Sequence, residues 1–480
     1  MTADVTRPTR RLASLGLAAT VLPVASRRAS AQGANPKLAD PKAQDPKAAE
    51  PPERVLRAAP ARARLAPDAA EEAELWRFDG DGLPVLRLRH GDELRVRLVN
   101  ETPAPLSLHW HGVRNQNAFD GAGGLTQPPV APGASFTYRF RPPDPGTSLV
   151  RPLVLGRSGE PAGRGLAGLL VVEEREPVPV DAEYALVVRD WRLEPSGALA
   201  PFGDPREAAL AGRLGHRLAV DGGDAPKRIE AAPGSRIRIR LANACNARIL
   251  RLRFDDLRVF VTGVDGQPAD KFEPLRSSLP FPPGSRYDIV LDLPRSPGAK
   301  GAITALVGDG LPLVALGTTD APARPERPPI AAPAPNPLLP AEIKLQAALR
   351  RDVLILGGAS RGPDGQLTFP GPGKPIWSVN GEPGSAAAPP LLQAKRGQPV
   401  VLGITNRTGF PQPLHLHGHV ARLLHPLDDG WEPYWMDTFQ VPEGKTVHIA
   451  FVADNPGRWL LGSTVLERLD AGLWTSFEVT

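Results

Sequence analysis

The sequence predicts an all-β protein made of three consecutive β-sandwich domains. The chain has 480 residues, more than one hydrophobic core usually organises. Its 57 prolines and 48 glycines are typical of many short strands and turns. Two sequence elements also recur three times along the chain, and these repeats favour three domains of the same kind.

The first repeated element is a segment that begins with glycine and ends with asparagine nine positions later. It occurs at 91–100, 234–243 and 397–406. In the first two copies apolar and polar residues alternate, which is typical of a half-buried strand, whereas the third copy is more continuously apolar.

The second repeated element is a strand bracketed by proline and glycine turns, at 132–146, 283–298 and 444–457. Inside the brackets large apolar residues alternate, as Phe136, Tyr138 and Phe140 do in the first copy. Repetition of both elements predicts three homologous sandwiches. We expect their boundaries at 56–176, 177–320 and 341–480, with proline-rich 321–340 as a linker.

The N-terminal segment 1–31 has the three parts of a signal peptide: Arg10-Arg11, an apolar run from Leu12 to Ala25, and Ala29-Ser30-Ala31 as a cleavage pattern. The paired arginines resemble a twin-arginine signal, so we expect export to the periplasm. A Sec signal or an uncleaved anchor is the alternative. The run is shorter than the roughly 20 apolar residues that span a bilayer, so no stable transmembrane anchor is expected after cleavage. Segment 32–55, rich in proline, alanine and lysine, is predicted to be a disordered spacer.

Charge and cysteine content narrow the function classes. The formal charge is +5, but the arginines alternate with aliphatic residues along predicted strands, so no nucleic-acid partner is expected. Cys245 is the single cysteine, which excludes an intramolecular disulfide and cysteine-rich metal sites. We expect it to be a buried, small apolar side chain rather than a reactive thiol.

Two histidine pairs carry the main chemical signal: His109 and His111 in the first repeat, and His415 and His417 in the third. Residues two apart on a strand face the same side, so each pair could present two imidazoles to one metal or to two neighbouring metals. A single such pair is more often a surface or hydrogen-bonded pair. Two pairs in different repeats, each followed by glycine, favour a shared site between domains.

Around these pairs the chain resembles the multicopper oxidase family, and in particular its bacterial laccase-like members. The resemblance runs from about Arg57 to Thr480 and rests on the motifs at 109–112, 120–121, 163–172, 264–268, 283–293, 414–419 and 454–459. It implies three cupredoxin-like Greek-key β-sandwich domains and a copper-dependent oxidoreductase.

The resemblance also implies roles for five residues. His109 and His415 match the two ligands of the type 2 copper, and His111 and His417 match two ligands of the type 3 pair. Asp120 matches the outer-sphere acid that helps move protons to reduced oxygen.

Other positions depart from the family pattern. Arg151 and Leu153 stand where two type 3 ligands are expected. The remaining departures concern the His-Cys-His motif and the type 1 ligands, at Gln412, Gly462, Ser463, Thr464, Arg468 and Leu473. The pattern also needs more histidines than the nine in this chain. A blue copper site needs a thiolate, so we expect the type 1 site to be lost.

These departures predict a degenerate member of the family, a pseudoenzyme with a scaffold or interaction role and a periplasmic protein partner. The alternative is a copper-binding oxidoreductase or copper-handling protein that uses one type 2-like copper ion at the four histidines. Arg151 would repel a second cation, so we expect at most one copper ion at this site. A further alternative is that the four histidines are only hydrogen-bonded and hold no metal. A fully active oxidase is disfavoured.

The other candidate residues are assigned no chemistry. His419 is expected to be structural or to support the ligands, and Trp110, Met436 and Trp459 to pack. No role is assigned to the remaining histidines, His90, His216, His425 and His448.

Overall fold

The computed structural model describes residues 51–79, 83–362, 364–371, 373–424, 430 and 432–480. The expected signal peptide, most of the expected spacer and His425 lie outside the described residues. Strand β1 begins at Arg54, so the last two residues of the expected spacer, 54 and 55, belong to a strand. Among the described residues no helix is long and apolar enough to cross a membrane.

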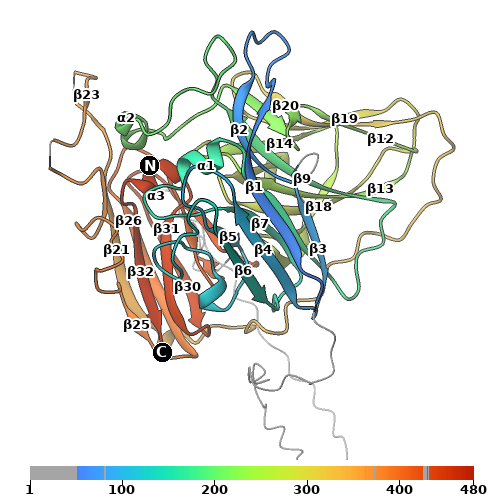
Figure 1. The fold of residues 1–480 in the computed structure, drawn as a ribbon. Helices are drawn as coiled ribbons and strands as arrows, with labels where there is room; N and C mark the ends of the chain where they lie inside the picture. The colour runs from blue at the N-terminus through green and yellow to red at the C-terminus, as the bar shows by residue number, and fades with distance from the viewer. Residues whose placement is uncertain (1–50, 80–82, 363, 372, 425–429, 431) are drawn as a thin grey trace, which may run out of the picture. The chain divides into compact units, whose positions relative to one another are not determined.

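The strands form three pairs of sheets that follow one another along the chain (Figure 1). The sheet orders are β2-β1-β4-β6 with β3-β8-β7-β5, then β11-β10-β9-β13-β18-β15-β16 with β12-β20-β19-β14-β17, then β24-β21-β26-β30-β28 with β25-β32-β31-β27-β29. A small hairpin, β22-β23, accompanies the third pair. The expected all-β fold of sandwich domains is confirmed, while the exact domain boundaries stay a prediction.

The strands of the first sandwich are β1 (Arg54–Ala63), β2 (Ala73–Phe78), β3 (Val85–Arg89), β4 (Leu94–Asn100), β5 (Leu108–His111), β6 (Ser135–Phe140), β7 (Gly146–Pro152) and β8 (Gly168–Glu173). Those of the second are β9 (Ala182–Trp191), β10 (Arg217–Val220), β11 (Gly223–Asp224), β12 (Lys227–Ala231), β13 (Arg236–Asn243), β14 (Leu250–Asp255), β15 (Val259–Val264), β16 (Gln267–Phe272), β17 (Ser278–Phe281), β18 (Arg286–Asp292), β19 (Lys300–Ala305) and β20 (Leu311–Thr318). Those of the third are β21 (Leu349–Gly357), β22 (Ser360–Arg361), β23 (Leu367–Thr368), β24 (Trp377–Val379), β25 (Gln393–Ala394), β26 (Gln398–Asn406), β27 (Gln412–Leu416), β28 (Arg422–Leu423), β29 (Thr438–Val441), β30 (Thr446–Ala453), β31 (Gly457–Ser463) and β32 (Trp474–Val479).

The helices are single turns between strands. The α-helices are α1 (Gly159–Gly163), α2 (Pro205–Ala209) and α3 (Leu466–Asp470), and the 3₁₀ turns are η1 (Asn117–Phe119), η2 (Leu275–Ser277) and η3 (Leu345–Ala347).

The two repeated sequence elements are neighbouring strands in all three sandwiches. The first element forms β4, β13 and β26, and the second forms β6, β18 and β30. Each first-element strand pairs antiparallel with the second-element strand of its own sandwich. Its other edge pairs parallel with β1, β9 or β21, the strand that opens that sandwich.

The asparagine that ends each first element is fully buried and serves the same purpose in each sandwich. The side-chain amides of Asn100, Asn243 and Asn406 donate to backbone carbonyls of the following loop and of a more distant segment. Their Oδ1 atoms accept the backbone N–H two residues on, at Thr102, Cys245 and Thr408. Buried polar groups need such partners, which explains the repeated asparagine. Cys245 therefore occupies the position that threonine holds in the other two sandwiches.

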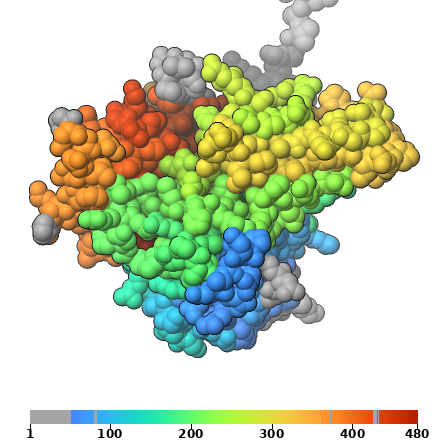
Figure 2. Space-filling model, turned by 90° about the horizontal axis from the view of Figure 1, so that it is seen from above, coloured from blue at the N-terminus to red at the C-terminus, as the bar shows by residue number. Residues whose placement is uncertain are grey.

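Buried strands carry His109, His111 and His415, and His417 directly follows the strand of His415. In the first sandwich all four residues of β5 are buried, and β5 pairs with β7. In the third, all of β27 is buried between β29 and β31. On the face shown in Figure 2, green atoms of the second sandwich border both the blue atoms of the first and the orange and red atoms of the third.

Candidate metal centre

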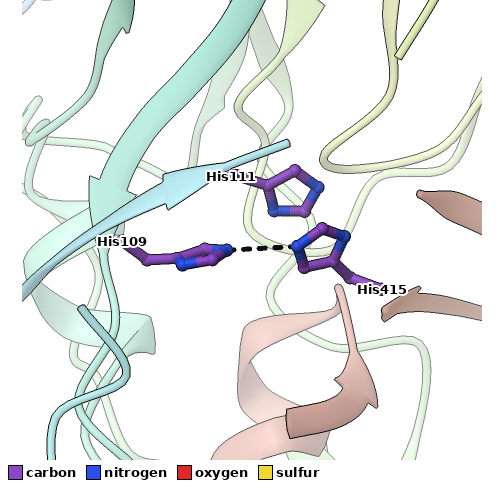
Figure 3. A group of neighbouring side chains, drawn as sticks. All are labelled: His109, His111 and His415. Atoms are coloured by element: carbon purple, nitrogen blue, oxygen red, sulfur yellow. Dashed lines mark hydrogen bonds between the residues drawn. The ribbon is translucent and has the colours of Figure 1, made fainter. Parts of the chain in front are cut away.

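Four imidazoles from two sandwiches meet in one buried cluster, and Figure 3 shows three of them, on His109, His111 and His415. His109 and His111 lie on β5, His415 lies on β27 and His417 follows it. The Nε2 atoms of His109 and His415 are 3.2 Å apart, although the two residues are 306 positions apart in sequence. The rings of His111 and His415 stack with centroids 3.6 Å apart, and those of His109 and His417 at 4.0 Å. The structure thus brings together the four histidines singled out in the sequence.

The hydrogen bonds of His109 and His415 determine where their protons lie. Nδ1 of His109 lies 2.8 Å from the backbone carbonyl of Asp120, and Nδ1 of His415 lies 3.0 Å from that of Asp437. A carbonyl oxygen only accepts, so in each ring Nδ1 carries the proton and Nε2 has a free lone pair. Two nitrogen lone pairs therefore face each other across 3.2 Å. Such a contact is favourable only when a proton or a metal cation lies between them.

Oxygen atoms also hold the other two imidazoles, through Nδ1 in His417 and through Nε2 in His111. Nδ1 of His417 donates to Oδ2 of Asp120 at 3.0 Å, which leaves its Nε2 lone pair free. The Thr438 hydroxyl donates to Asp437, so it accepts from Nε2 of His111 at 2.9 Å. Nδ1 of His111 is buried and has no hydrogen-bond partner among the described residues. Outer hydrogen bonds that fix tautomer and ring orientation are typical of metal-ligating histidines.

Burial keeps three of these imidazoles, on His111, His415 and His417, neutral. It lowers the pKa of His415 to about 4, against the opposing effect of Asp437. Burial and the neighbouring His109 lower the pKa of His417 to about 3, and burial lowers that of His111 well below its usual value. Neutral imidazoles disfavour a bridging proton and are the form that binds copper. His109, His111 and His415 offer ligand atoms that all lie within 4.8 Å of one another, so these residues fit a copper ion.

Asp120 lies beside the cluster, fully buried. His109, Asp120 and His417 form a second group whose ligand atoms lie within 4.8 Å of one another. Burial raises the pKa of Asp120, but interactions with His417 and His109 outweigh burial and lower it below the usual range. Asp120 is therefore an anion at neutral pH that holds the His417 ring.

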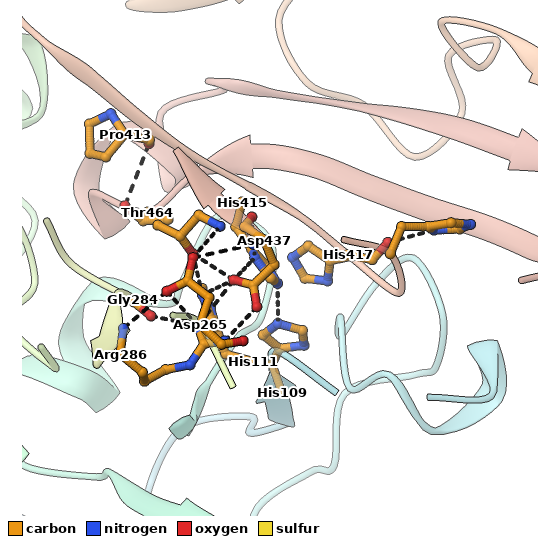
Figure 4. A network of polar contacts seen from close by, with 12 residues as sticks. His109, His111, Asp265, Gly284, Arg286, Pro413, His415, His417, Asp437 and Thr464 are labelled. Atoms are coloured by element: carbon orange, nitrogen blue, oxygen red, sulfur yellow. Dashed lines mark hydrogen bonds and ion pairs between the residues drawn. The ribbon is translucent and has the colours of Figure 1, made fainter. Parts of the chain in front are cut away.

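A buried ionic network supports the cluster from the second sandwich (Figure 4). Both Nη atoms of Arg286 donate to the carboxylate of Asp437, the residue whose backbone holds His415. Asp265, in the motif Val264-Asp265-Gly266, accepts the backbone N–H groups of Asp437 and Thr438. Burial and the charge of Asp437 raise the pKa of Asp265 to about 7. Sequence reasoning quoted the motifs that contain Asp265 and Arg286 without giving either residue a role. It missed Asp437 and Thr438, for which no spacing pattern gives a signal.

The positions matched to the type 1 ligands form a different buried group. Arg468 donates from Nη1 to Oε1 of Gln412 and to the carbonyl of Pro411, both at 2.8 Å. Its guanidinium also lies over the rings of Trp377 and Phe410. Burial lowers the pKa of Arg468 to about 10, so it is a cation at neutral pH. Ser463 and Leu473 are buried in the same region, where the Ser463 N–H donates to the Leu473 carbonyl.

Cys245 and His419 both lie outside the cluster of four histidines. Cys245 is buried in the second sandwich, where burial and Asp190 raise its pKa well above the usual value. His419 uses both ring nitrogens: Nδ1 donates to the His417 carbonyl and Nε2 accepts from the Asn455 N–H. These bonds give His419 a structural position outside the cluster.

Comparisons with known proteins agree with this architecture. Multicopper oxidase family models match residues 61–177 and 363–480. Multicopper oxidase MmcO from Mycobacterium tuberculosis is 31% identical, over 79% of this chain and 77% of that protein. The crystal structure of a multi-copper oxidase from Pseudomonas parafulva has 30% identity and a TM-score of 0.77, covering 89% of this chain and 100% of that one. A multi-copper oxidase from Pseudomonas thermotolerans has 29% identity and the same TM-score of 0.77, covering 89% of this chain and 99% of that one. The chain belongs to the multicopper oxidase family.

Proposed function

We propose that this chain is an exported copper-binding protein that holds one copper ion at His109, His111, His415 and His417 and does not turn over as a laccase. The observation that carries the proposal is the pair of Nε2 lone pairs, on His109 and His415, that face each other at 3.2 Å. Bound copper would supply a one-electron redox couple at this site. The chain's own contribution is orientation, because Asp120, Asp437 and Thr438 hold the outer nitrogens of all four rings.

Loss of the electron-entry site is the second part of the proposal. A blue copper ion needs a thiolate and two imidazoles, and the matched positions carry Ser463, Gln412 and a charged guanidinium at Arg468. The guanidinium repels a copper cation, and the sole cysteine is buried beside Asp190 instead. Without this site, substrate oxidation would not be coupled to four-electron reduction of oxygen.

A copper-free scaffold role with a periplasmic protein partner is the other prediction from the sequence. It shares the loss of the type 1 site with the leading proposal and differs in metal content. Export to the periplasm is part of both proposals. Copper stoichiometry therefore separates them.

The test is metal analysis of protein produced and folded with copper available. We expect one copper ion per chain, a paramagnetic resonance spectrum without blue-copper character and no intense thiolate-to-copper absorption. His109→Ala and His415→Ala should each lose the copper, whereas His448→Ala, at an exposed position on β30, should keep it. If the purified chains lack stoichiometric copper, the copper proposal is refuted and the scaffold role remains. Oxidation of a phenol with consumption of oxygen would refute the loss of the electron-entry site.

A further inference from the structure

Arg151 is a buried cation at the edge of the histidine cluster. It lies on β7 directly opposite His109 of β5, so the two side chains share a face of the sheet. Only 4% of the residue is exposed. Its Nε and Nη1 atoms are buried and have no hydrogen-bond partner in the described part of the chain.

The charge of Arg151 is not compensated by the carboxylate next to it. Asp437 attracts Arg151 electrostatically, but its oxygens already accept both Nη atoms of Arg286 and the Thr438 hydroxyl. Arg286 itself repels Arg151. The contrast with Arg286 is sharp, because that guanidinium donates from Nε, Nη1 and Nη2. A buried charge without a partner is costly, so Arg151 is poised for an anion.

We propose that Arg151 binds a small planar oxyanion, of the carboxylate or bicarbonate class, beside the histidine cluster. The guanidinium is a planar array of N–H donors whose spacing matches two oxygens of such an anion. A small anion is required because Arg151 is buried. The anion would also offset the repulsion between Arg151 and a copper ion held by His111. The inference thus extends the proposed copper site, but the donors it uses belong to Arg151 alone.

Sodium formate titrated into copper-free protein tests the site, at an ionic strength held constant with sodium chloride. We expect saturable binding, followed by the shift of ¹³C-formate resonances and by a rise in the unfolding temperature. Arg151→Leu should weaken formate binding about tenfold or more, because a hydrogen-bonded charge partner is removed. Leucine is apolar and suits a buried position, and Leu153, two residues further along the chain, is itself buried just after β7 ends. Arg151→Lys should bind formate weakly, because it keeps the charge but lacks the planar donors.

Parallel copper analysis of the same samples keeps the two proposals separate. Formate binding without copper binding would refute the copper site alone. Copper binding in a protein that shows no saturable formate effect would refute the anion site alone, as would formate binding that is equal in wild type and folded Arg151→Leu.

Discussion

Each imidazole of the cluster is held by an oxygen on its outer side, and the most heavily used of these supports is Asp437. Its backbone carbonyl accepts from His415, and its carboxylate accepts from Thr438 and from Arg286, which is fully buried. Burial raises the pKa of Asp437, but Arg286 outweighs this effect and keeps the carboxylate ionised. One residue therefore orients two ligands, His415 directly and His111 through Thr438, and neutralises a guanidinium.

Asp437→Asn should strongly destabilise the protein. The asparagine removes the negative charge that pairs most closely with Arg286 and leaves only the Asp265 carboxylate, 3.8 Å away, as its ionic partner. Breaking a buried ion pair typically costs about 3–5 kcal/mol. Urea unfolding of copper-free protein measures the loss. Asp224→Asn is the matched control, because Asp224 pairs with Arg217 at the surface and exposed pairs contribute about 1 kcal/mol or less. Equal effects of the two substitutions would contradict the role of the buried pair.

The residues of the site were only partly predictable from the sequence. His109, His111, His415 and His417 stand in two His-x-His pairs, and a period of two predicts a shared face. Arg286 and Asp437 are 151 positions apart and neither belongs to a pair or motif with metal-ligand spacing. Their contact depends on how the second and third sandwiches pack, which strand periodicity does not describe.

At the scale of elements, the repeats were the most predictable feature. Alternating apolar residues predicted β4 and β13, and the same spacing of glycine and asparagine predicted the more continuously apolar β26. The segments between proline and glycine turns predicted their partner strands. The reason for the terminal asparagine became clear only from its contacts, since one amide joins three backbone groups across a loop. The same contacts explain Cys245 as a residue of the repeat.

Cys245→Thr should leave both folding and copper content intact. Thr102 and Thr408 occupy the equivalent place, where their hydroxyls donate to the asparagine Oδ1 at 2.7 Å. A threonine at 245 should make the same bond to Asn243, so we expect a stability change of less than about 1.5 kcal/mol, the net contribution of one hydrogen bond. Metal analysis and urea unfolding measure the two quantities. Loss of copper on this substitution would show that the thiol takes part in metal binding.

The segment after β27 should make stability depend on pH through His419. Burial lowers the pKa of His419 to about 4 from an ordinary 6.5, although Asp454 opposes this shift. The folded chain therefore keeps a neutral ring, while the unfolded chain binds a proton below pH 6.5. Stability from this group is complete above pH 6.5 and falls as the pH drops toward 4.

A comparison with His419→Gln isolates this contribution from other titrating groups. Between pH 7 and pH 5 the advantage of wild type over the variant should shrink by about 2 kcal/mol, since one pH unit corresponds to about 1.4 kcal/mol. Urea unfolding of copper-free proteins at both pH values gives the two differences. A difference that stays constant with pH would contradict a buried neutral His419.

At the scale of the whole described unit, the third sandwich is joined to the other two by buried polar contacts as well as by the chain. The N–H groups of Ser158 and Gly159 donate to Asp470 of α3, and the Trp377 indole donates to the Ala208 carbonyl at 2.6 Å. Across the cluster, Arg286 pairs with Asp437. These contacts involve residues on both sides of the expected linker 321–340, so association of the sandwiches should survive cleavage of that linker.

A protease site inserted between Ala331 and Ala332, which are both exposed, tests this expectation. After cleavage, the wild-type fragments should migrate as one particle in size-exclusion chromatography, because separation would break the buried Arg286–Asp437 pair and divide the histidine cluster. Cleaved Asp437→Asn protein should separate at a lower urea concentration than cleaved wild type. Copper should raise the urea concentration at which the cleaved wild-type fragments separate. One ion with ligands on β5 and β27 binds only the associated state and so stabilises it. Separation of the cleaved wild-type fragments in buffer without denaturant would mean that the covalent linker, and not the buried interface, holds the site together.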